Sequence, residues 1–287
     1  MSDAVVRPLL PTDVEPAQAS SYAALREAGS RYGWSMPELD EAVRERGRRR
    51  VAHLQRTDPG GCWVLEHRDR VVGVALATRR GPLWFLSLLT VDPAAQARRL
   101  GARLLDAALG TAEGATAGLI MASSDPKALR RYGLAGFALL PGYSASGPVD
   151  RALLPVVGGV RDGHWARDRE RVDALGMRLR GAAYGPDLDL YRDNGYRLLV
   201  AADGFAVLGP GGLAVLGAGT PAVAADLLWT VLAEGPAEVE IVPLTGGQQW
   251  AVDVALRARL ALAPSESVCT RGAVGPMAPY LPSGAYG

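Results

Sequence analysis

A short basic loop between an apolar run and an amphipathic segment is the first set of residues whose types and spacing suit chemistry. Residues 83–91 are almost entirely apolar, and the loop after them carries Gln96, Arg98 and Arg99. Gly101 then opens a segment whose apolar residues recur at helical spacing. A strand, a basic loop and a helix in this order direct backbone N–H groups and a helix N-terminus at one place, which suits a phosphate or pyrophosphate. The alternative is an ordinary strand-to-helix turn with solvated arginines.

A second motif follows further along the chain. Residues 118–122 predict a short buried strand, and Asp125-Pro126 is typical of a helix start. The next segment fits the spacing A-x-x-x-Y-x-x-x-G-F, with Ala128, Tyr132, Gly136 and Phe137 at the four fixed positions. Two motifs in this order are more specific than either motif alone.

Together the two motifs resemble those of the GNAT superfamily of acyl-CoA-dependent N-acyltransferases. The central motif of that family is R/Q-x-x-G-x-G/A after a strand that ends in V-x-P. This chain matches the motif at Gln96 and Gly101, whereas Arg99 stands where the first glycine is usual. The resemblance covers about the first half of the chain, where we also expect strands at residues 5–9, 62–67, 71–78 and 83–91.

The resemblance implies direct transfer of an acetyl group from acetyl-CoA, the cosubstrate, to an amine. Tyr132 would protonate the leaving thiolate, because a phenol has a pKa of about 10 and a thiol of about 8.5. The alternative for Tyr132 is a half-buried helix residue bonded to a backbone carbonyl. A backbone N–H near the strand end would stabilise the oxyanion. The residues assigned to the cofactor, the first two through the backbone, are Leu89, Val91, Gln96, Ala97, Arg98, Arg99, Gly101 and Ala102.

The sequence does not identify the general base or the acceptor. Residues 84–90 contain no Asp or Glu, and Ser87 is too weak a base alone, so water or a group from the second half of the chain is left. The acceptor is expected to be a small-molecule or peptide amine, with polyamines, amino acids, antibiotics and peptide N-termini all open. The alternative from another class of function is a non-catalytic acyl-CoA sensor or regulatory protein.

The second half of the chain repeats the element order of the first. Expected strands at residues 196–202, 205–208 and 213–216 precede an expected helix at 221–232, a strand at 238–244 and a helix at 248–260. Phe137 and Leu260 lie 123 positions apart in matching segments, and Leu89 and Leu216 lie 127 apart. Similar offsets at two places indicate duplication. We therefore expect an α/β fold of two tandem GNAT-like domains, residues 1–145 and 146–287, each with a mixed, splayed sheet flanked by helices. The linker is expected between residues 141 and 160, where residues 142–148 are small and polar.

The second copy is expected to have lost the chemistry. Its loop, residues 217–220, contains no Arg or Gln, and Ala255 stands in the place of Tyr132. The C-terminal tail, residues 275–287, is aromatic and rich in proline. It either lines the acceptor site with Tyr280 or Tyr286, or simply covers the second sheet.

Composition limits the remaining possibilities. The net charge is +1, so no overall field favours nucleic acid or a membrane. Two cysteines and three histidines form neither a disulfide framework nor a metal pattern, and we expect no metal. The N-terminus does not resemble a signal peptide and no apolar run reaches spanning length, so we expect a cytoplasmic monomer or homodimer. The basic run at residues 44–50 is expected to be the solvent face of a helix ending at Gly47, or alternatively a lid over an acidic substrate.

Overall fold

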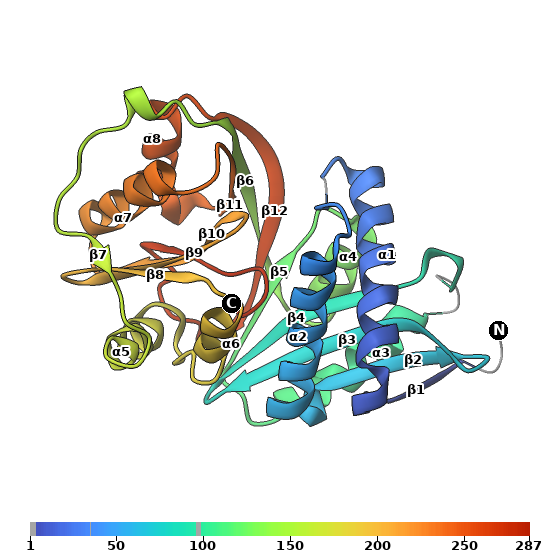
Figure 1. Ribbon diagram of the computed structural model, residues 1–287. Helices are drawn as coiled ribbons and strands as arrows, with labels where there is room; N and C mark the ends of the chain where they lie inside the picture. The colour runs from blue at the N-terminus through green and yellow to red at the C-terminus, as the bar shows by residue number, and fades with distance from the viewer. Residues whose placement is uncertain (1–3, 35, 96–98) are drawn as a thin grey trace. The chain divides into compact units, whose positions relative to one another are not determined.

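The computed structural model describes residues 4–34, 36–95 and 99–287, and strands alternate with helices along the chain (Figure 1). The strands are β1 (Val5–Pro8), β2 (Cys62–His67), β3 (Arg70–Arg80), β4 (Leu83–Val91), β5 (Ala117–Ala122), β6 (Ala138–Pro148), β7 (Arg161–Asp162), β8 (Arg197–Ala201), β9 (Gly204–Gly209), β10 (Gly212–Ala218), β11 (Glu238–Leu244), β12 (Ala261–Gly272) and β13 (Tyr280–Leu281). The helices are α1 (Val14–Tyr32), α2 (Glu41–Thr57), α3 (Leu100–Leu109), α4 (Pro126–Leu134), α5 (Arg169–Arg180), α6 (Asp187–Asp193), α7 (Pro221–Glu234) and α8 (Gln249–Arg257).

The chain divides into two compact units that do not coincide with the two halves of the sequence. The first unit comprises the described parts of residues 1–79, 84–115 and 125–127. The second comprises residues 80–83, 116–124 and 128–287. Strands β5 and β6, which belong to the first half of the sequence, therefore lie in the second unit.

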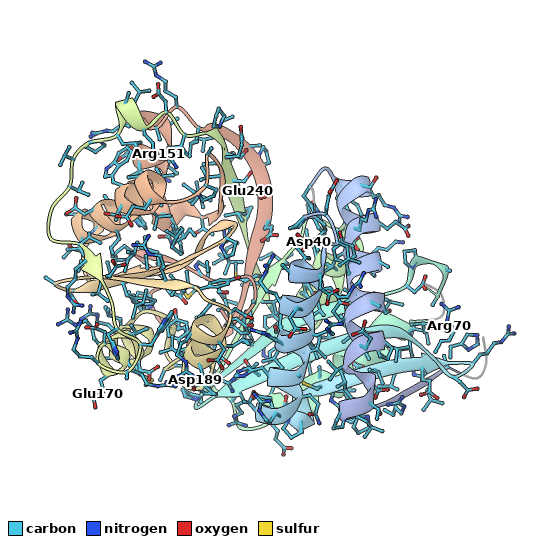
Figure 2. The ribbon with its side chains drawn as sticks, in the orientation of Figure 1. Asp40, Arg70, Arg151, Glu170, Asp189 and Glu240 are labelled. Atoms are coloured by element: carbon cyan, nitrogen blue, oxygen red, sulfur yellow. The ribbon has the colours of Figure 1, made fainter. Side chains whose placement is uncertain are left out.

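The first unit is a sheet with the strand order β1-β2-β3-β4. Helices α1 and α2 lie side by side on one face, and α3 packs on the other face against β1 and β2 (Figure 1). Helix α2 begins where Asp40, labelled in Figure 2, accepts a hydrogen bond from the N–H of Val43 at 2.7 Å. This side chain satisfies one of the backbone donors that the first turn of a helix leaves unpaired.

In the second unit, β12 lies between β5 and β6. The strand order is β5-β12-β6-β11, with Ser267 of β12 opposite Ala122 of β5 and opposite Pro141 of β6. The last long strand of the second sequence half therefore separates two strands of the first half. Residues 142–148, which lie within the stretch 141–160 where the boundary is expected, belong to β6 and pair with β12 on one side and β11 on the other.

The second sheet of this unit has the order β13-β10-β9-β8-β7. The element order β8-β9-β10-α7-β11-α8-β12 repeats the order β2-β3-β4-α3-β5-α4-β6, so the fold contains two copies of one strand–helix order, as the sequence predicts. Strands β10 and β11 follow one another in the second copy but belong to different sheets. The sheet of this copy is therefore split at the position where the family fold is splayed.

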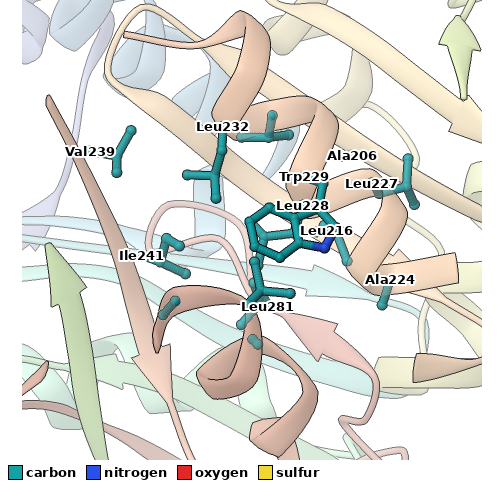
Figure 3. Close-up of a cluster of buried hydrophobic side chains, with 14 of the residues drawn as sticks. Ala206, Leu216, Ala224, Leu227, Leu228, Trp229, Leu232, Val239, Ile241 and Leu281 are labelled. Carbon is teal, nitrogen blue, oxygen red and sulfur yellow. The ribbon is translucent and has the colours of Figure 1, made fainter. Parts of the chain in front are cut away.

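Apolar side chains of α7, α8 and the surrounding strands form the core of the second unit (Figure 3). Trp229 and Leu228 of α7 lie close to Leu216 of β10 and Leu281 of β13. Leu216, Leu228 and Leu281 are almost completely buried. Burial of one such side chain stabilises a fold by roughly 1.5–3 kcal/mol, so the tail contributes to this core.

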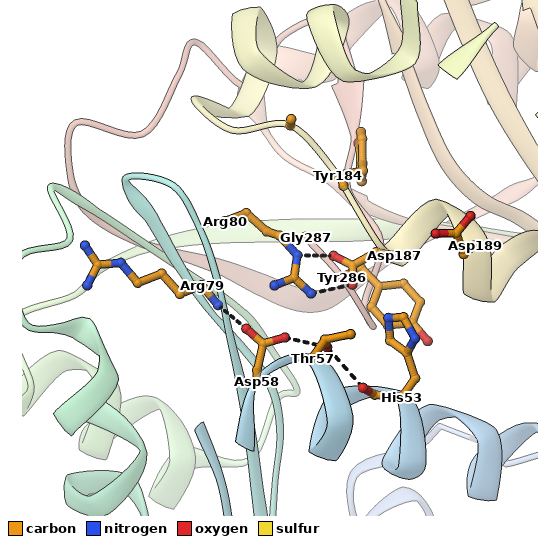
Figure 4. Close-up of polar contacts among 12 residues, drawn as sticks. His53, Thr57, Asp58, Arg79, Arg80, Tyr184, Asp187, Asp189, Tyr286 and Gly287 are labelled. Carbon is orange, nitrogen blue, oxygen red and sulfur yellow. Dashed lines mark hydrogen bonds and ion pairs between the residues drawn. The ribbon is translucent and has the colours of Figure 1, made fainter. Parts of the chain in front are cut away.

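An ion pair links Arg80, the last residue of β3, to helix α6 within the second unit (Figure 4). Arg80 donates from Nε to Asp187 Oδ2 at 2.9 Å and from Nη2 to Asp187 Oδ1 at 2.6 Å. Asp187 is fully buried and the Arg80 side chain is 9% exposed. A buried carboxylate needs such a bidentate partner, because an unpaired charge in this position would be strongly destabilising.

The position of β12 predicts that the first copy does not fold alone. A chain of residues 1–150 keeps β5 and β6 but loses the strand between them, leaving backbone donors and acceptors unpaired. We expect it to lack the cooperative thermal unfolding of the full chain, measured by circular dichroism. Cooperative unfolding of residues 1–150 near the midpoint of the full chain would show that β12 is dispensable.

Candidate active site

The end of β4 combines a partly exposed strand with the start of a helix. Residues 83–87 of β4 are buried, and burial falls at Leu88 and Leu89. After Val91 the chain turns at Asp92, whose carboxylate accepts a hydrogen bond from the N–H of Ala94 at 2.9 Å. Leu88, Leu89 and Val91 at the end of β4 are therefore partly exposed, whereas the residues before Leu88 are buried.

Arg99 has the backbone conformation for which the family motif uses glycine. Its φ is 62°, in the left-handed region, and it directly precedes α3. Its carbonyl accepts hydrogen bonds from the N–H groups of Ala102 and Arg103 at 3.0 and 3.1 Å. A side chain in this region costs about 1–2 kcal/mol. Arg99 therefore adopts the left-handed backbone conformation of the turn despite this energetic cost, and its exposed side chain adds a positive charge.

The structure places five of the predicted cofactor residues in the first unit. Leu89 and Val91 lie at the end of β4, Arg99 precedes α3, and Gly101 and Ala102 lie in the first turn of α3. Gln96, Ala97 and Arg98 lie outside the described residues.

Tyr132 lies on α4, in the second unit, and is 5% exposed. Its carbonyl accepts hydrogen bonds from the N–H groups of Ala135 and Phe137, both at 3.1 Å, where Gly136 turns the chain with a φ of 86°. This turn between α4 and β6 explains why the motif has glycine at that position. Tyr132 is more deeply buried than the half-buried helix residue of the alternative interpretation.

Arg50 contacts the strand that the sequence predicts to carry the acyl group. Its Nη2 donates to the carbonyl and, at 2.7 Å, to Oγ of Ser87, which is 6% exposed. A hydroxyl that accepts from a guanidinium is a poorer proton acceptor, so Ser87 is not suited to act as a base. Arg50 belongs to the basic run at residues 44–50, but its contact with β4 is not indicated by the sequence, because α2 and β4 are distant in the chain.

The predicted end of a helix at Gly47 is wrong. Helix α2 continues through Gly47 to Thr57. A Cβ at this glycine would lie 2.9 Å from Cγ of Gln18 on α1, so the residue is required for close packing of the two helices. Arg48 does face solvent and pairs with Glu15, Glu41 and Glu45, as expected for an exposed helix face.

Glu266 is a polar residue that the sequence does not point to. The register between β12 and β6 shifts between Pro264 and Ser267, and a Cβ on Gly142 of β6 would lie 2.7 Å from the carbonyl oxygen of Glu266. This bulge lies just beyond Ala122, the last residue of β5. Burial, and then the charge of Glu240 on β11 (Figure 2), raise the pKa of the Glu266 carboxyl. A partly buried carboxyl with a raised pKa is typical of acid–base groups.

An open cleft of about 510 Å³ lies in the first unit against α1 and the turn after β2, and it reaches Asp92 and Pro93 directly after β4. Its charged lining residues are Arg7, Asp13, Glu27, Glu66, Asp69, Arg70 and Asp92. Arg7 donates to Asp13 and Glu66, and its hydrogen bond is the main cause that lowers the pKa of the Asp13 carboxyl. Carboxylates outnumber arginines in this lining, so the cleft does not suit phosphates.

The described cysteines and acidic residues offer neither a nucleophile nor a metal site. Burial raises the pKa of both Cys62 and Cys269 to about 12, so neither forms a thiolate readily. In the described part of the chain, no three His, Cys, Asp or Glu side chains are grouped to hold a metal ion. No helix among the described residues is long and apolar enough to span a membrane.

The fold and these residues define an α/β protein in which two copies of one strand–helix order share a sheet, with a basic turn and a buried tyrosine in the first copy. The profile of the Acetyltransferase (GNAT) family matches residues 24–137. Residues 24–137 therefore match the GNAT acetyltransferase family, and the fold of the chain is that of tandem GNAT structures.

Solved structures show the same fold over nearly the whole chain. A putative acetyltransferase from Pyrococcus horikoshii has a TM-score of 0.79 at 18% identity, covering 100% of this chain and 97% of that one. A GCN5-related N-acetyltransferase from Sphaerobacter thermophilus has a TM-score of 0.59 at 16% identity, covering 94% and 95%. A tandem GNAT protein from the clavulanic acid biosynthesis pathway has a TM-score of 0.58 at 16% identity, covering 94% and 98%. No curated protein matches the chain in sequence.

Proposed function

We propose that the chain is an N-acetyltransferase that moves an acetyl group from acetyl-CoA to an amine by direct attack on the thioester. The observation that carries this proposal is the family match at residues 24–137, which includes β4, the Arg99 turn and Tyr132. We also propose that residues 1–145 and 146–287 are the two copies, and that only the first is active.

In this proposal the backbone at Leu89 and Val91 holds the acyl and pantetheine arm by strand-like hydrogen bonds. The phosphates lie at the start of α3, where Gln96, Arg98 and Arg99 supply polar and cationic donors and the helix N-terminus supplies a positive dipole end. Gly101 and Ala102, in the first helical turn, let the backbone come close to the phosphates.

The reaction then needs one base and one acid. The base removes a proton from the acceptor ammonium, and the free amine attacks the thioester carbonyl. The new C–N bond forms and a backbone N–H of β4 stabilises the oxyanion. The nitrogen, positively charged after the attack, loses its remaining extra proton to solvent, and the C–S bond breaks as the carbonyl returns. Tyr132 gives its phenolic proton to the departing CoA thiolate and regains one from solvent.

Glu266 is our candidate for the base. Tyr132 and Glu266 lie in the same unit, on elements that adjoin the same end of β5: α4 follows β5 in the chain, and the bulge of β12 lies beyond Ala122. A carboxylate whose pKa is raised is a stronger base than an ordinary one, and its negative charge attracts an ammonium.

Release of free CoA from acetyl-CoA, followed with a thiol reagent across polyamines, amino acids, aminoglycosides and peptide N-termini, tests the proposal. Acetyl-CoA binding by calorimetry without turnover would favour a sensor.

Replacing Arg98 and Arg99 together by Ala should weaken acetyl-CoA binding, since each charge-assisted hydrogen bond contributes about 1.5–3 kcal/mol. Arg48→Ala is the matched control on an exposed ion pair. Unchanged affinity of the double variant would place the phosphates elsewhere.

Tyr132→Phe should lower kcat by about 10²–10⁴, the range of a positioned proton donor. The KM for acetyl-CoA should change little, because phosphates and pantetheine are held by other residues. Tyr191→Phe is the control: Tyr191 is also buried, and its hydroxyl donates to Oγ of Ser283 at 2.8 Å. It should lose similar stability, about 1 kcal/mol, and keep its turnover. Equal effects of both variants on kcat would contradict the acid role.

Glu266→Gln should lower kcat by a similar factor and remove the acidic limb of the pH–rate profile. The stability of the Glu266→Gln variant, unlike its turnover, should not decrease. The raised pKa means that the folded state binds the proton more tightly than the unfolded state, so ionisation destabilises the fold as pH rises through the unfolded and then the folded pKa. Glutamine removes that penalty, so the thermal midpoint at pH 7 should not fall. Glu238→Gln, at an exposed position of β11, is the control, and intact turnover of Glu266→Gln would exclude Glu266 as the base.

A further inference from the structure

The C-terminal tail, residues 275–287, pairs with the edge of β10. It does so at the positions that correspond to the proposed acyl-CoA contacts of the first copy. The match of Leu89 with Leu216 makes Ala218 the counterpart of Val91. Strand β13 pairs antiparallel with β10, with Leu281 opposite Leu216 and Tyr280 opposite Gly217. The N–H of Ala218 donates to the carbonyl of Pro279 at 3.2 Å.

β13 also lies at the split between the two sheets. One edge of β10 pairs with β9, and β13 pairs with the other edge while also contacting β11. In the first copy, we propose that the pantetheine arm extends along the corresponding strand. In the second copy a peptide backbone supplies the equivalent hydrogen bonds.

Buried side chains fix the tail in this place. Tyr280 is fully buried, its hydroxyl lies 2.5 Å from that of Tyr184, and it donates to the carbonyl of Gly287 at 2.7 Å. Gln248, 3% exposed, donates from Nε2 to the carbonyl of Met277 at 2.6 Å and accepts from the N–H of Tyr280 at 3.3 Å. Leu281 adds apolar contact within the core of the unit (Figure 3).

The loop before α7 is also closed to phosphate. The N–H of Gly219 donates to the carbonyl of Asp203 at 2.8 Å, and the hydroxyl of Thr220 caps α7 by accepting from the N–H of Val223 at 3.3 Å. A Cβ on Gly219 would lie 1.7 Å from Oδ2 of Asp203 and 2.8 Å from Nη2 of Arg178, so the ion pair of these two side chains directly adjoins this loop. The guanidinium of Arg178 is already paired with this carboxylate at 2.7 Å, and the pair fills the space beside the loop that a phosphate would need.

We infer that the tail is an intramolecular ligand of the second copy, taking the place that the pantetheine arm takes in the first. The comparison with the first copy rests on the proposed function. The chain consequently binds one acyl-CoA, and the tail keeps the split sheet of the second copy closed by satisfying the backbone of β10.

Hydrogen exchange of the full chain, followed by mass spectrometry with and without saturating acetyl-CoA, tests the inference. Peptides covering residues 212–220 and 275–287 should be protected without ligand and unchanged by it, while residues 83–102 gain protection. Faster exchange of the tail, or added protection of residues 212–220, on addition of acetyl-CoA would overturn the inference. Unchanged exchange at residues 83–102 would count against the proposed function alone.

A variant tests, in the absence of acetyl-CoA, whether the tail occupies the edge of β10. Leu281→Pro removes a ladder N–H from β13 and should speed exchange of residues 212–220 by about tenfold or more, since pairing is what protects these amides. Gly284→Ala is the control, because a Cβ there meets no atom within 4 Å. If Leu281→Pro fails to fold, the ligand comparison on the unaltered chain still decides. Unchanged exchange at residues 212–220 in a folded Leu281→Pro variant would overturn the inference.

Discussion

The pairing of β12 with both β5 and β6 is the constraint on which the second unit depends. A strand of the second copy completes a sheet that the first copy begins, so neither copy has a closed set of backbone hydrogen bonds by itself. Backbone N–H and C=O groups must find partners when buried, and a central strand supplies them on both edges. The second copy is thus required for the fold whether or not it has any chemistry. The ion pair of Arg80 with Asp187 adds a second connection between segments of the two copies.

This requirement explains how one copy can lose a ligand site without losing its strands. A strand edge at a split sheet has to be satisfied by a ligand, by water or by another segment of the chain. In the second copy β13 satisfies it, and apolar side chains such as Leu281 add burial that a transient ligand would not provide. Leu89 and Leu216 therefore occupy equivalent strands with different partners. The first is partly exposed and the second completely buried.

Local patterns predicted the elements well, and long-range packing accounts for the differences. The bounds of β2 and β4 follow from their apolar runs and flanking turns, and those of β8 to β11 are close to the expected ranges. Gly47 was expected to end a helix because glycine is a poor helix former, but its missing side chain is needed where α1 crosses α2. Residues 142–148 looked like a linker because small residues are common in loops, yet here they allow β6 to pair on both edges. The contacts of Arg50 and Glu266 depend on strands and helices far apart in sequence, so no local pattern indicated them.

Tyr132 and Glu266 would have to work together within a limited range of protonation states. The acid must be protonated and the base ionised in the same molecule, which holds only between their two pKa values. An ordinary phenol has a pKa of about 10 and an ordinary glutamate of about 4.3, so for unperturbed groups the pH range between the two values is wide. Burial raises the pKa of Glu266, which makes its carboxylate a stronger base. The raised pKa also raises the lower limit of the pH range in which both groups have the required protonation state. Glu266 lies at the bulge of β12, so the strand that completes the sheet would also position the base.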